Sequence, residues 1–254
     1  GALVMFMQAG FAMVESGCCR FKNVQNVLLK NLVDVCVGTI GWYIFGYSFA
    51  FSGPFNKDGF KSNGFAGGEA FMGHHFNVNR PDGQIEPSMS TLTWFFQWAF
   101  CSASATIVSG GVAERVNFPG YLIFSFFMTS FIYPMVVAWT WGYGFLMAMN
   151  TTGTVDFAGS GIVHMTGGVG ALVGAAIAGP RFGRWLNSDG SDQSRNERVM
   201  TVPVAFNPHS MVLIVFGTFC LWFGWYGFNC GSTLSMHTIE KGMLAAQVAM
   251  NTTI

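Results

Sequence analysis

Three polar residues at a regular spacing stand at the edge of a long apolar run, and their side chains are of types that bind cations and move protons. Asp156, Ser160 and His164 lie four residues apart. On an α-helix they would share one face, with His164 about 12 Å beyond Asp156 at 1.5 Å per residue. A histidine there is either a proton-handling group or a hydrogen-bonded core residue, and an aspartate there is either a functional acid or a helix N-cap. For Asp156 the two interpretations are compatible.

A second set of residues combines aromatic rings with a small hydroxyl. Phe96 and Phe100 are spaced i and i+4, as are Phe228 and Ser232, and Trp141 is the second tryptophan of the motif Trp-Thr-Trp-Gly. Aromatic residues at the ends of apolar helices commonly belong to the interfacial belt or to helix packing. Aromatic faces beside a hydroxyl acceptor also suit a small cation. The sequence leaves both interpretations open.

Other ionisable residues favour structural roles. Lys30 and Asp34 are spaced i and i+4 near Glu15, which predicts an ion pair between Lys30 and Asp34 on one helix face. His74 and His75 are adjacent in a polar, Gly-rich stretch. Because no third ligand follows at a suitable spacing, we interpret them as a solvated pair and not as a metal site.

The composition describes a protein whose solvent is largely lipid. Charged residues make up 9% of the 254 residues and hydrophobic residues 51%, and the mean hydropathy is +0.42. The 12 basic and 12 acidic residues cancel, so the chain has no basic field for nucleic acid. Its six cysteines form no Cys-x-x-Cys pair, which predicts neither a zinc site nor a disulfide framework. We expect no metal and no cofactor.

Apolar stretches without charged residues predict an all-α polytopic membrane protein. We expect seven helices, near residues 1–16, 28–52, 91–113, 120–148, 158–179, 211–230 and 241–254. The chain begins and ends inside apolar runs, so we expect it to be a piece of a larger protein. We divide it into a first five-helix repeat (1–180, its first span truncated), a polar cytoplasmic linker (181–209) and the start of a second repeat (210–254).

The distribution of basic residues between the predicted helices sets their orientation. One set of alternate connections carries Arg20, Lys22, Lys30, Arg115, Arg181, Arg184, Arg195 and Arg198, whereas the other carries Lys57, Lys61, Arg80 and Lys241. The richer set is expected in the cytoplasm. The N-terminus and the stretch 53–90 would then lie outside.

Five segments resemble the ammonium transporter (Amt/Mep/Rh) family in the family's order. They are FMQAGFAMVESG, FKNVQNVLLKNLVD, FQWAFCSASATIVSGGVAERV, VDFAGSGIVHMTGGVGALVGAAIAGPRFGR and LWFGWYGFNCGS. The resemblance implies an outer N-terminus, a bundle of eleven spans built as an inverted repeat, and a homotrimer with one pore per subunit. This chain would supply about the first six to seven spans.

The resemblance also implies roles for particular residues. Trp141 and Ser232, with Phe100, would form the outer ammonium recruitment site, and Phe100 and Phe228 the stacked pore gate. His164 would be the first of two pore histidines, and Asp156 the acid that supports cation binding. The Rh branch usually lacks the Trp and Ser pair, so the resemblance is to the Amt branch. The second pore histidine would lie in a later span that this chain does not contain.

These observations predict a non-enzymatic transporter of ammonium or ammonia, with methylammonium as an analogue, in the lipid bilayer of the plasma membrane. An ammonium sensor or a non-conducting homologue is the main alternative. A membrane-embedded enzyme fits less well, because about 12 Å of helix would separate Asp156 from His164 and no nucleophile, metal-ligand or phosphate-loop motif stands nearby.

Overall fold

The structure is a computed structural model of the whole chain, and it describes residues 1–51, 55–56, 59–60, 65–147, 149, 152–187 and 201–254. The basic residues Lys57, Lys61, Arg195 and Arg198, which entered the orientation argument, lie outside the described residues. The description that follows concerns the remaining chain.

The seven predicted helices are present as seven helical rods. They comprise α1 (Ala2–Cys18); α2 (Val24–Gly41) with η2 (Trp42–Gly46) and α3 (Tyr47–Phe51); α4 (Met89–Val112); α5 (Phe118–Phe127) with η4 (Met128–Ile132) and α6 (Tyr133–Trp139); η5 (Ser160–Met165) with α7 (Thr166–Ala178); α8 (Met211–Trp225) with η6 (Tyr226–Cys230); and α9 (Ile239–Thr253). The segments η2, η4, η5 and η6 are π-helical turns. Such turns inside helices often mark functional sites.

The remaining elements are short. They are the 3₁₀ turns η1 (Phe21–Asn23) and η3 (Phe71–Gly73), and three antiparallel hairpins that pair β1 (Phe55–Asn56) with β2 (Gly59–Phe60), β3 (Asn77–Asn79) with β4 (Ile85–Pro87), and β5 (Trp185–Asn187) with β6 (Thr201–Pro203). Pro203 pairs with Trp185 in the third hairpin, so part of the polar linker returns on itself.

The fourth rod ends earlier than predicted, at Trp139 and not near residue 148. Thr140 leaves helical geometry with φ −119° and ψ −94°. Gly142 then approaches α3 so closely that a Cβ on it would lie 2.1 Å from the Ala50 carbonyl oxygen. The residues after Trp139 are still apolar, so hydropathy alone predicts a longer helix. The close contact between Gly142 and the Ala50 carbonyl requires a turn at Thr140, which a continuous helix cannot make.

Local signals begin several helices as the sequence suggests. Side-chain oxygens of Ser88, Asn117, Ser210 and Thr238 accept hydrogen bonds from the first-turn N–H groups of α4, α5, α8 and α9. Within the described residues, four helical segments are long and apolar enough to cross a membrane, at Phe21–Phe51, Phe118–Trp139, Ser160–Ala178 and Met211–Cys230. The chain is therefore a polytopic membrane protein.

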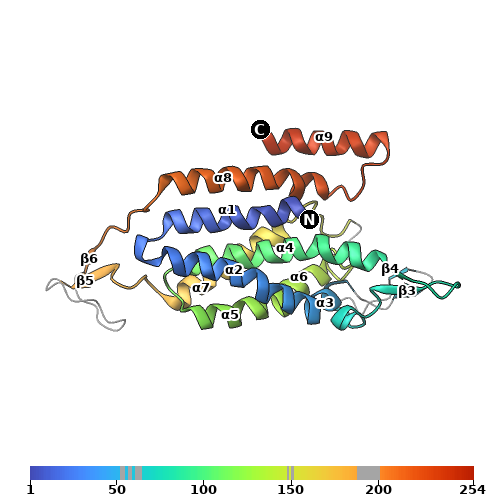
Figure 1. Cartoon of the computed structure of the whole chain (residues 1–254), viewed down its shortest axis with the longest axis horizontal. Coiled ribbons are helices and arrows are strands. Elements are labelled where there is room, and N and C mark those ends of the chain that lie inside the picture. The colour runs from blue at the N-terminus through green and yellow to red at the C-terminus, as the bar shows by residue number, and fades with distance from the viewer. Residues whose placement is uncertain (52–54, 57–58, 61–64, 148, 150–151, 188–200) are drawn as a thin grey trace.

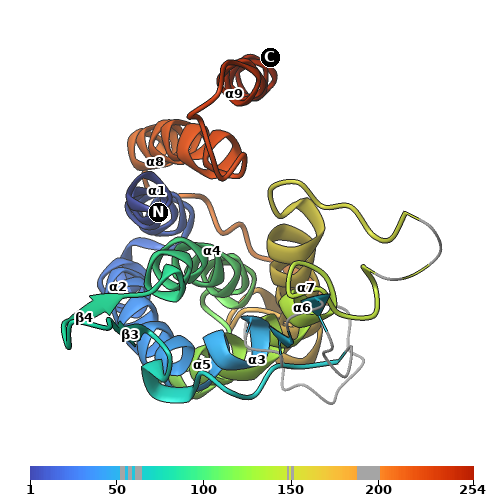
Figure 2. The same ribbon diagram turned by 90° about the vertical axis from the view of Figure 1, so that its right-hand side faces the viewer.

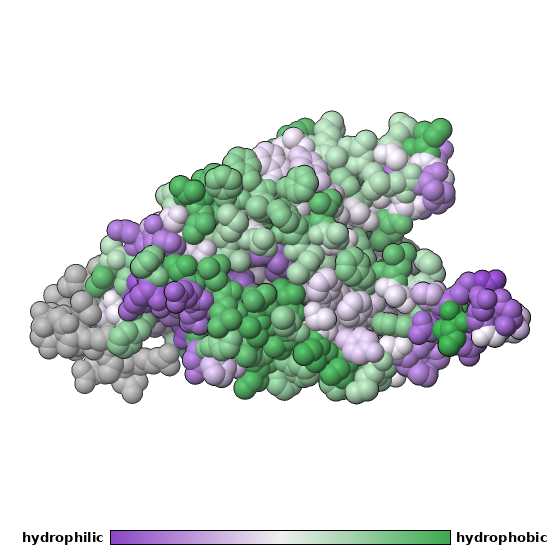
Figure 3. Space-filling model, viewed as in Figure 1, coloured by the Kyte–Doolittle hydropathy of each residue, from purple (hydrophilic) through white to green (hydrophobic). Residues whose placement is uncertain are grey.

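Helices α1, α2, α4 and α8 run along the long axis of the molecule (Figure 1). Seen along that axis, α9, α8 and α1 follow one another in a row, and α4 lies between α1 and the group formed by α5, α6 and α7 (Figure 2). Hydrophobic residues form a broad belt over the middle of the visible face, and hydrophilic residues gather toward its two ends (Figure 3). This pattern suits a bilayer crossed along the long axis.

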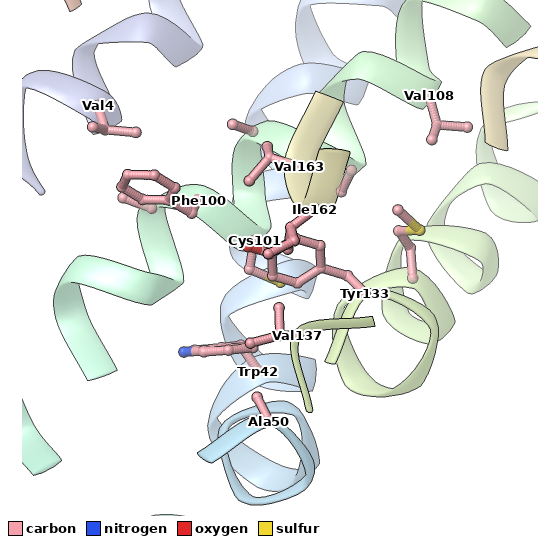
Figure 4. Packing of buried hydrophobic residues seen from close by; sticks show 14 of the residues in the cluster. Val4, Trp42, Ala50, Phe100, Cys101, Val108, Tyr133, Val137, Ile162 and Val163 are labelled. Atoms are coloured by element: carbon pink, nitrogen blue, oxygen red, sulfur yellow. The ribbon is translucent and has the colours of Figure 1, made fainter. Parts of the chain in front are cut away.

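Large aromatic and small apolar side chains share the core of the first bundle. Trp42, Phe100 and Tyr133 are fully buried, and the close-up view places them with Ile162 and Val163 where η2, α4, α6 and η5 meet (Figure 4). Buried alanines on α4 leave room for these rings. The core therefore ties the segment carrying His164 to the helix carrying Phe100.

Glycines let α1 and α8 pack backbone to backbone. A Cβ on Gly10 would lie 2.8 Å from the Gly217 carbonyl oxygen, and a Cβ on Gly217 would lie 2.7 Å from the Gly10 carbonyl oxygen. Gly17 and Gly224 repeat this close approach seven residues away on each helix. Small residues give the same close approach between membrane helices elsewhere.

The predicted ion pair between Lys30 and Asp34 is wrong. Lys30 Nζ lies 3.2 Å from Glu15 Oε2 on α1, whereas Asp34 accepts hydrogen bonds from Ser125 on α5 and from Thr106 on α4. The i and i+4 spacing put the two side chains on one face of α2. In the packed bundle, Lys30 instead pairs with a residue of α1, and Asp34 bonds residues of α4 and α5.

Candidate functional site

Two phenylalanine rings from different helices meet at the centre of the candidate site. Phe100 of α4 and Phe228 of η6 are buried, with ring centroids 4.0 Å apart and planes 30° apart. Phe96 lies one turn before Phe100, and these two centroids are 4.7 Å apart. The pair joins the first helical bundle to the rod formed by α8 and η6, and it leaves no space for a solute between the rings.

Trp141 stands next to this pair in the turn after α6. Its ring lies edge-on to Phe100, with centroids 6.0 Å apart and planes at 76°. Its indole Nε1 donates a 2.7 Å hydrogen bond to the backbone carbonyl of Asp156. The orientation of Trp141 is thus set from two sides, by the ring of Phe100 and by the segment that precedes η5.

Ser232 joins the same region through the rod that carries Phe228. Its hydroxyl donates a 2.8 Å hydrogen bond to the Phe228 carbonyl one turn earlier, and the residue is half-buried. The neighbouring Gly231 faces Phe96, since a Cβ added there would lie 3.3 Å from that ring. The structure therefore brings Phe100 into contact with both Phe228 and Trp141, and it places Ser232 one helical turn after Phe228.

Asp156 does not share a helix face with His164, which corrects the first expectation. The helix begins at Ser160, and Asp156 precedes it. Each carboxylate oxygen of Asp156 accepts two backbone N–H groups: Oδ1 those of Gly159 and Ser160, and Oδ2 those of Gly161 and Ile162. Gly159, and not Asp156, is the N-cap residue, but the Asp156 carboxylate has the expected capping role, because these bonds satisfy the otherwise unpaired donors of the first turn.

His164, on the π-turn η5, lies next to the Phe228 ring of the phenylalanine pair. Its ring centroid is 5.4 Å from that of Phe228 and 6.0 Å from that of Trp225, which is stacked at 26°. Its Nδ1 is 3.2 Å from the Gly159 carbonyl oxygen. A neutral imidazole that donates from Nδ1 presents Nε2 as an acceptor, so this contact favours one tautomer.

A pocket of about 500 Å³ adjoins His164 and the phenylalanine pair. It is lined by Asp156, Phe157, Ala158, Ser160, His164, Trp225, Phe228, Asn229, Val248, Asn251 and Thr252. Asn229 donates a 3.0 Å hydrogen bond to Thr252, which ties η6 to α9. The pocket combines aromatic walls with a few polar groups, which is the composition of a small-ligand site.

The structure adds residues that the sequence reasoning missed. Gly159 adopts φ +101°, and a Cβ on it would lie 2.6 Å from Val163 Cγ2 and 3.2 Å from Trp141 Cη2. Glycine is therefore required at the turn that lets Asp156 cap the helix and Trp141 approach it. The run Asp-Phe-Ala-Gly-Ser-Gly contained this signal. Nothing in the local pattern pointed to Trp225, Asn229 or the face of α9.

A second polar centre ties together three connections at the opposite end of the bundle, which we call the basic end (Arg20, Arg115, Arg181 and Arg184). Glu114, at φ +58° just after α4, accepts hydrogen bonds from Arg20 (2.9 Å), Arg181 (2.8 Å) and Asn23. Burial by itself would raise the pKa of Glu114, but these hydrogen bonds outweigh it and lower the pKa to about 2. Phe206 lies beneath the Arg20 guanidinium, 3.9 Å from ring centroid to Cζ.

The His74 and His75 rings meet edge to face in the hairpin region, with centroids 4.0 Å apart and planes at 64°. His74 Nδ1 contacts the Glu69 carbonyl oxygen at 3.1 Å. Among the residues that the structure describes, no group of three or more His, Cys, Asp or Glu side chains is arranged to hold a metal ion.

Fold and site together define a polytopic helical membrane protein in which buried aromatic rings and a histidine stand between helices of different segments. The family model described as the Ammonium Transporter Family matches residues 1–254, so the chain belongs to that family. The predicted helical-bundle fold and membrane location are confirmed, and the family to which the chain belongs is a transporter family and not an enzyme family.

Curated relatives and solved structures agree with this assignment. Ammonium transporter Amt2 of Archaeoglobus fulgidus is 39% identical over 254 residues, covering 97% of this chain and 48% of that protein. Ammonium transporter 1 member 2 of Arabidopsis thaliana is 44% identical, covering 89% of this chain and 40% of that protein. The chain thus spans about half the length of the curated relatives it matches.

Two solved structures resemble the fold. One, described as "Sensor Amt Protein", has a TM-score of 0.75 at 31% identity, and the match covers 96% of this chain and 55% of that structure's chain. Candida albicans Mep2 has a TM-score of 0.67 at 28% identity, and the match covers 91% of this chain and 46% of the Mep2 chain.

Proposed function

We propose that the whole protein transports ammonium across a membrane, with recruitment of NH4+ at an aromatic and hydroxyl site and conduction past His164. The observation that carries this proposal is the contiguous arrangement of Trp141, Phe100, Phe228 and His164. The relatives from Archaeoglobus fulgidus and Arabidopsis thaliana are named ammonium transporters, which supports the same substrate. We expect methylammonium to be accepted as an analogue.

The first step is binding of the cation beside the phenylalanine pair. The Trp141 face attracts a small cation through its quadrupole, and Ser232 supplies a hydroxyl oxygen on the neighbouring turn. The backbone carbonyl of Asp156 orients the indole, and the carboxylate of Asp156 holds the start of η5. Asp156 therefore supports cation binding chiefly through position and through its negative charge.

The second step separates ammonium from potassium. The two ions are similar in size, so diameter alone cannot select between them. The closed pair of Phe100 and Phe228 presents an apolar barrier that a bare cation crosses only at a large desolvation cost. Ammonium escapes this cost by losing a proton, whereas potassium cannot. Opening of the pair would then admit neutral ammonia to the space beside His164.

The third step returns or relays the proton. The Gly159 carbonyl favours the tautomer with a proton on Nδ1, so Nε2 of His164 is the acceptor. Transfer of a proton to Nε2 and its release on the far side would let charge move with ammonia. We expect a second pore histidine to complete this relay in the whole protein.

Uptake and current measured together test the proposal. The whole protein should accumulate labelled methylammonium in cells that lack other ammonium transporters, and added ammonium should evoke a current that potassium does not. Absence of uptake from a protein that reaches the membrane would contradict transport. As a matched comparison, Phe219→Ala removes a ring that is stacked on Trp222, away from the site, and should leave uptake unchanged.

A sensor is the second candidate, because one solved structure similar to this chain is described as "Sensor Amt Protein". In that case ammonium would bind at the Trp141 site without crossing the membrane. Binding measured by isothermal calorimetry on the purified protein, combined with absent uptake, would favour sensing. Binding with uptake would favour transport.

We also propose an arrangement for the whole protein. Residues 1–180 form the first five-helix repeat, 181–209 the cytoplasmic linker and 210–254 the start of a second repeat. The glycine contact between α1 and α8 supports this division, because it joins the first helices of the two proposed repeats. We expect a homotrimer, and native mass spectrometry in detergent checks it. A monomer that still transports would remove the trimer from the proposal.

A further inference from the structure

A column of hydroxyl groups runs along α4 on the side away from the phenylalanine pair. Ser104 donates a 3.1 Å hydrogen bond to the Val163 carbonyl in η5, so it belongs to the side of α4 that faces His164. Ser102, Thr106 and Ser109 follow the i, i+4, i+7 spacing of one helix face. They are buried; Thr106 bonds Gln8 of α1 and Asp34 of α2, and Ser109 bonds Glu15 of α1.

Asp34 is bound in the middle of this column and is only 2% exposed. Its Oδ1 accepts a hydrogen bond from Ser125, and its Oδ2 lies 3.0 Å from Thr106 Oγ1. The same Thr106 oxygen lies 2.7 Å from Gln8 Oε1 and 2.8 Å from the Ser102 carbonyl oxygen. One hydroxyl proton cannot serve three acceptors at once. If Asp34 carries a proton on Oδ2, the bond between Asp34 and Thr106 reverses: Asp34 donates to the Thr106 oxygen, and the single Thr106 proton is left for Gln8 Oε1 or the Ser102 carbonyl oxygen.

Glu15 ends the column. Its Oε2 accepts a hydrogen bond from Ser109 (3.0 Å) and forms an ion pair with Lys30 (3.2 Å). Its Oε1 has no hydrogen-bond partner, although the residue is more than nine-tenths buried. The buried atoms Gln8 Nε2 and Ser102 Oγ also have no partner. Polar atoms left in this way inside a protein are usually satisfied by ordered water. The three atoms lie along the contact between α1 and α4.

A pocket connects Glu15 with the basic end. Its volume is about 350 Å³, and its lining includes Glu15 and Cys18 of α1 and Gly110 and Glu114 on the α4 side. Gly110 leaves the approach to the carboxylate open, since a Cβ there would still lie 3.9 Å from Glu15 Oε1. The column is therefore buried at Asp34 and reaches a pocket at Glu15.

We propose that this column is a proton-binding site, holding internal water and one exchangeable proton on Asp34, and that the proton enters and leaves through the Glu15 pocket. The Tyr121 hydroxyl of α5 is within hydrogen-bond reach of both Ser109 and Asp34, so it links them. A proton from pocket water passes to Glu15 and then through water, Ser109 and Tyr121 to Asp34, and it returns by the same groups. The inference does not rest on the proposed transport, because the column is separate from the contacts of His164.

The charged and titratable groups around the column fit a single exchangeable proton. Asp34 is faced by Lys30 of its own helix and, from other helices, by Glu15, Cys101 and Tyr121. Lys30 Nζ lies 4.9 Å from the centroid of the Tyr121 ring and bonds Glu15.

At the pocket, Glu15 is accompanied by Cys18, Cys19, Glu114, Arg115 and Arg181. Lys30 offsets one of the two buried carboxylates, so a proton on the other makes the column neutral. Burial favours this neutral state.

Infrared difference spectroscopy of the whole protein in lipid nanodiscs tests the proton on Asp34. We expect an absorption band of a protonated carboxyl group in a buried environment that shifts when H2O is replaced by D2O. Asp34→Asn should abolish the band. Glu240→Gln is the matched control, because it removes an exposed acid at the start of α9 and should leave the band unchanged. A band that persists in Asp34→Asn, or no band in the wild type, would overturn the site. The latter result would indicate an ionised Asp34 with the Gln8 amide turned toward Thr106.

The route is tested by the rate of deuterium exchange at that band. Glu15→Gln keeps the size of the side chain but cannot carry the proton, so exchange should slow about tenfold, equivalent to a barrier higher by about 1.4 kcal/mol. Exchange at the wild-type rate would overturn entry through Glu15. Thr106→Val keeps Asp34 and removes its hydroxyl partner, so the band should move in frequency. This variant still decides the proposal if Asp34→Asn does not fold, and an unchanged band in it would overturn the column.

Discussion

His164 is the residue at which a proton relay and a packing role give opposite expectations. As a relay, it needs a group that can bind and release a proton, so we predict that His164→Glu retains some transport, with altered ion selectivity. His164→Ala should abolish charge-coupled flux or admit potassium while the protein still reaches the membrane. Ammonium-evoked current, potassium permeation and surface expression are measured for both variants.

The packing role predicts the reverse order at His164. Alanine would then leave a cavity and reduce assembly, and a buried glutamate would be at least as damaging. Normal selective ammonium current in His164→Ala would rule out the relay.

Trp141 tests the proposed recruitment site. We predict that Trp141→Leu weakens apparent affinity for methylammonium and its discrimination from other cations, because a cation over an aromatic face is stabilised by about 0.5–2 kcal/mol. Ser232→Ala should act in the same direction. Uptake is measured across substrate concentrations. Trp185→Leu is the control, since Trp185 is an exposed tryptophan beside Arg184 at the basic end, and equal effects of the two tryptophan changes would argue for general packing.

Glu114 provides a test of electrostatics at the basic end. Its pKa is lowered from 4.5 to about 2, so its charged form stabilises the fold at neutral pH. That contribution is fully present above about pH 4.5 and is lost as the pH falls through about 2. We predict that Glu114→Gln lowers the free energy of unfolding by about 1–3 kcal/mol at neutral pH, and that the difference from wild type shrinks in acid.

Thermal unfolding in detergent across this pH range measures the effect at Glu114. Glu86→Gln is the matched control, because Glu86 pairs with Arg80 on the exposed β4 hairpin and the loss should be about 0–1 kcal/mol. A difference between Glu114→Gln and wild type that persists unchanged in acid would contradict the assigned cause.

At the scale of elements, the contact between α1 and α8 depends on Gly217. Alanine there would place a methyl group 2.7 Å from the Gly10 carbonyl oxygen and force the helices apart. We predict that Gly217→Ala destabilises the protein by about 1–3 kcal/mol, although alanine favours a helix by about 0.5–1 kcal/mol. Gly242→Ala on α9 meets nothing within 4 Å and should be neutral or stabilising. Unfolding midpoints in mixed detergent micelles compare them, and equal midpoints would remove the close contact as a source of stability.

At the scale of the whole molecule, the bias of basic residues predicts the orientation. We expect position 184, at the basic end, to face the cytoplasm and position 74, in the hairpin region, to face outside. Single cysteines placed at these positions, after replacement of the exposed Cys18 and Cys36, are labelled with an impermeant thiol reagent in intact cells. Labelling of position 184 with protection of position 74 would reverse the orientation and the direction of the proposed transport.

The amino-acid sequence by itself determined where the helices lie and which residues deserve study. Runs without charge predict the seven rods, because the bilayer requires long apolar stretches whatever the neighbouring helices are. Ser210 and Asn117 begin their helices through bonds to nearby backbone, which is local information. The motif around Asp156 and Gly159 also contained its own turn chemistry.

Only the tertiary structure decided which side chains meet. Helical spacing predicted that Lys30 pairs with Asp34, but Lys30 forms its ion pair with Glu15 on another helix. Asp156 and His164 do not share a helix face, because the helix begins at Ser160, four residues after Asp156. The stacking of Phe100 on Phe228 joins residues far apart in the chain. Hydropathy and helical period describe each segment separately, whereas a partner is chosen by the distances and unsatisfied groups that appear when helices pack.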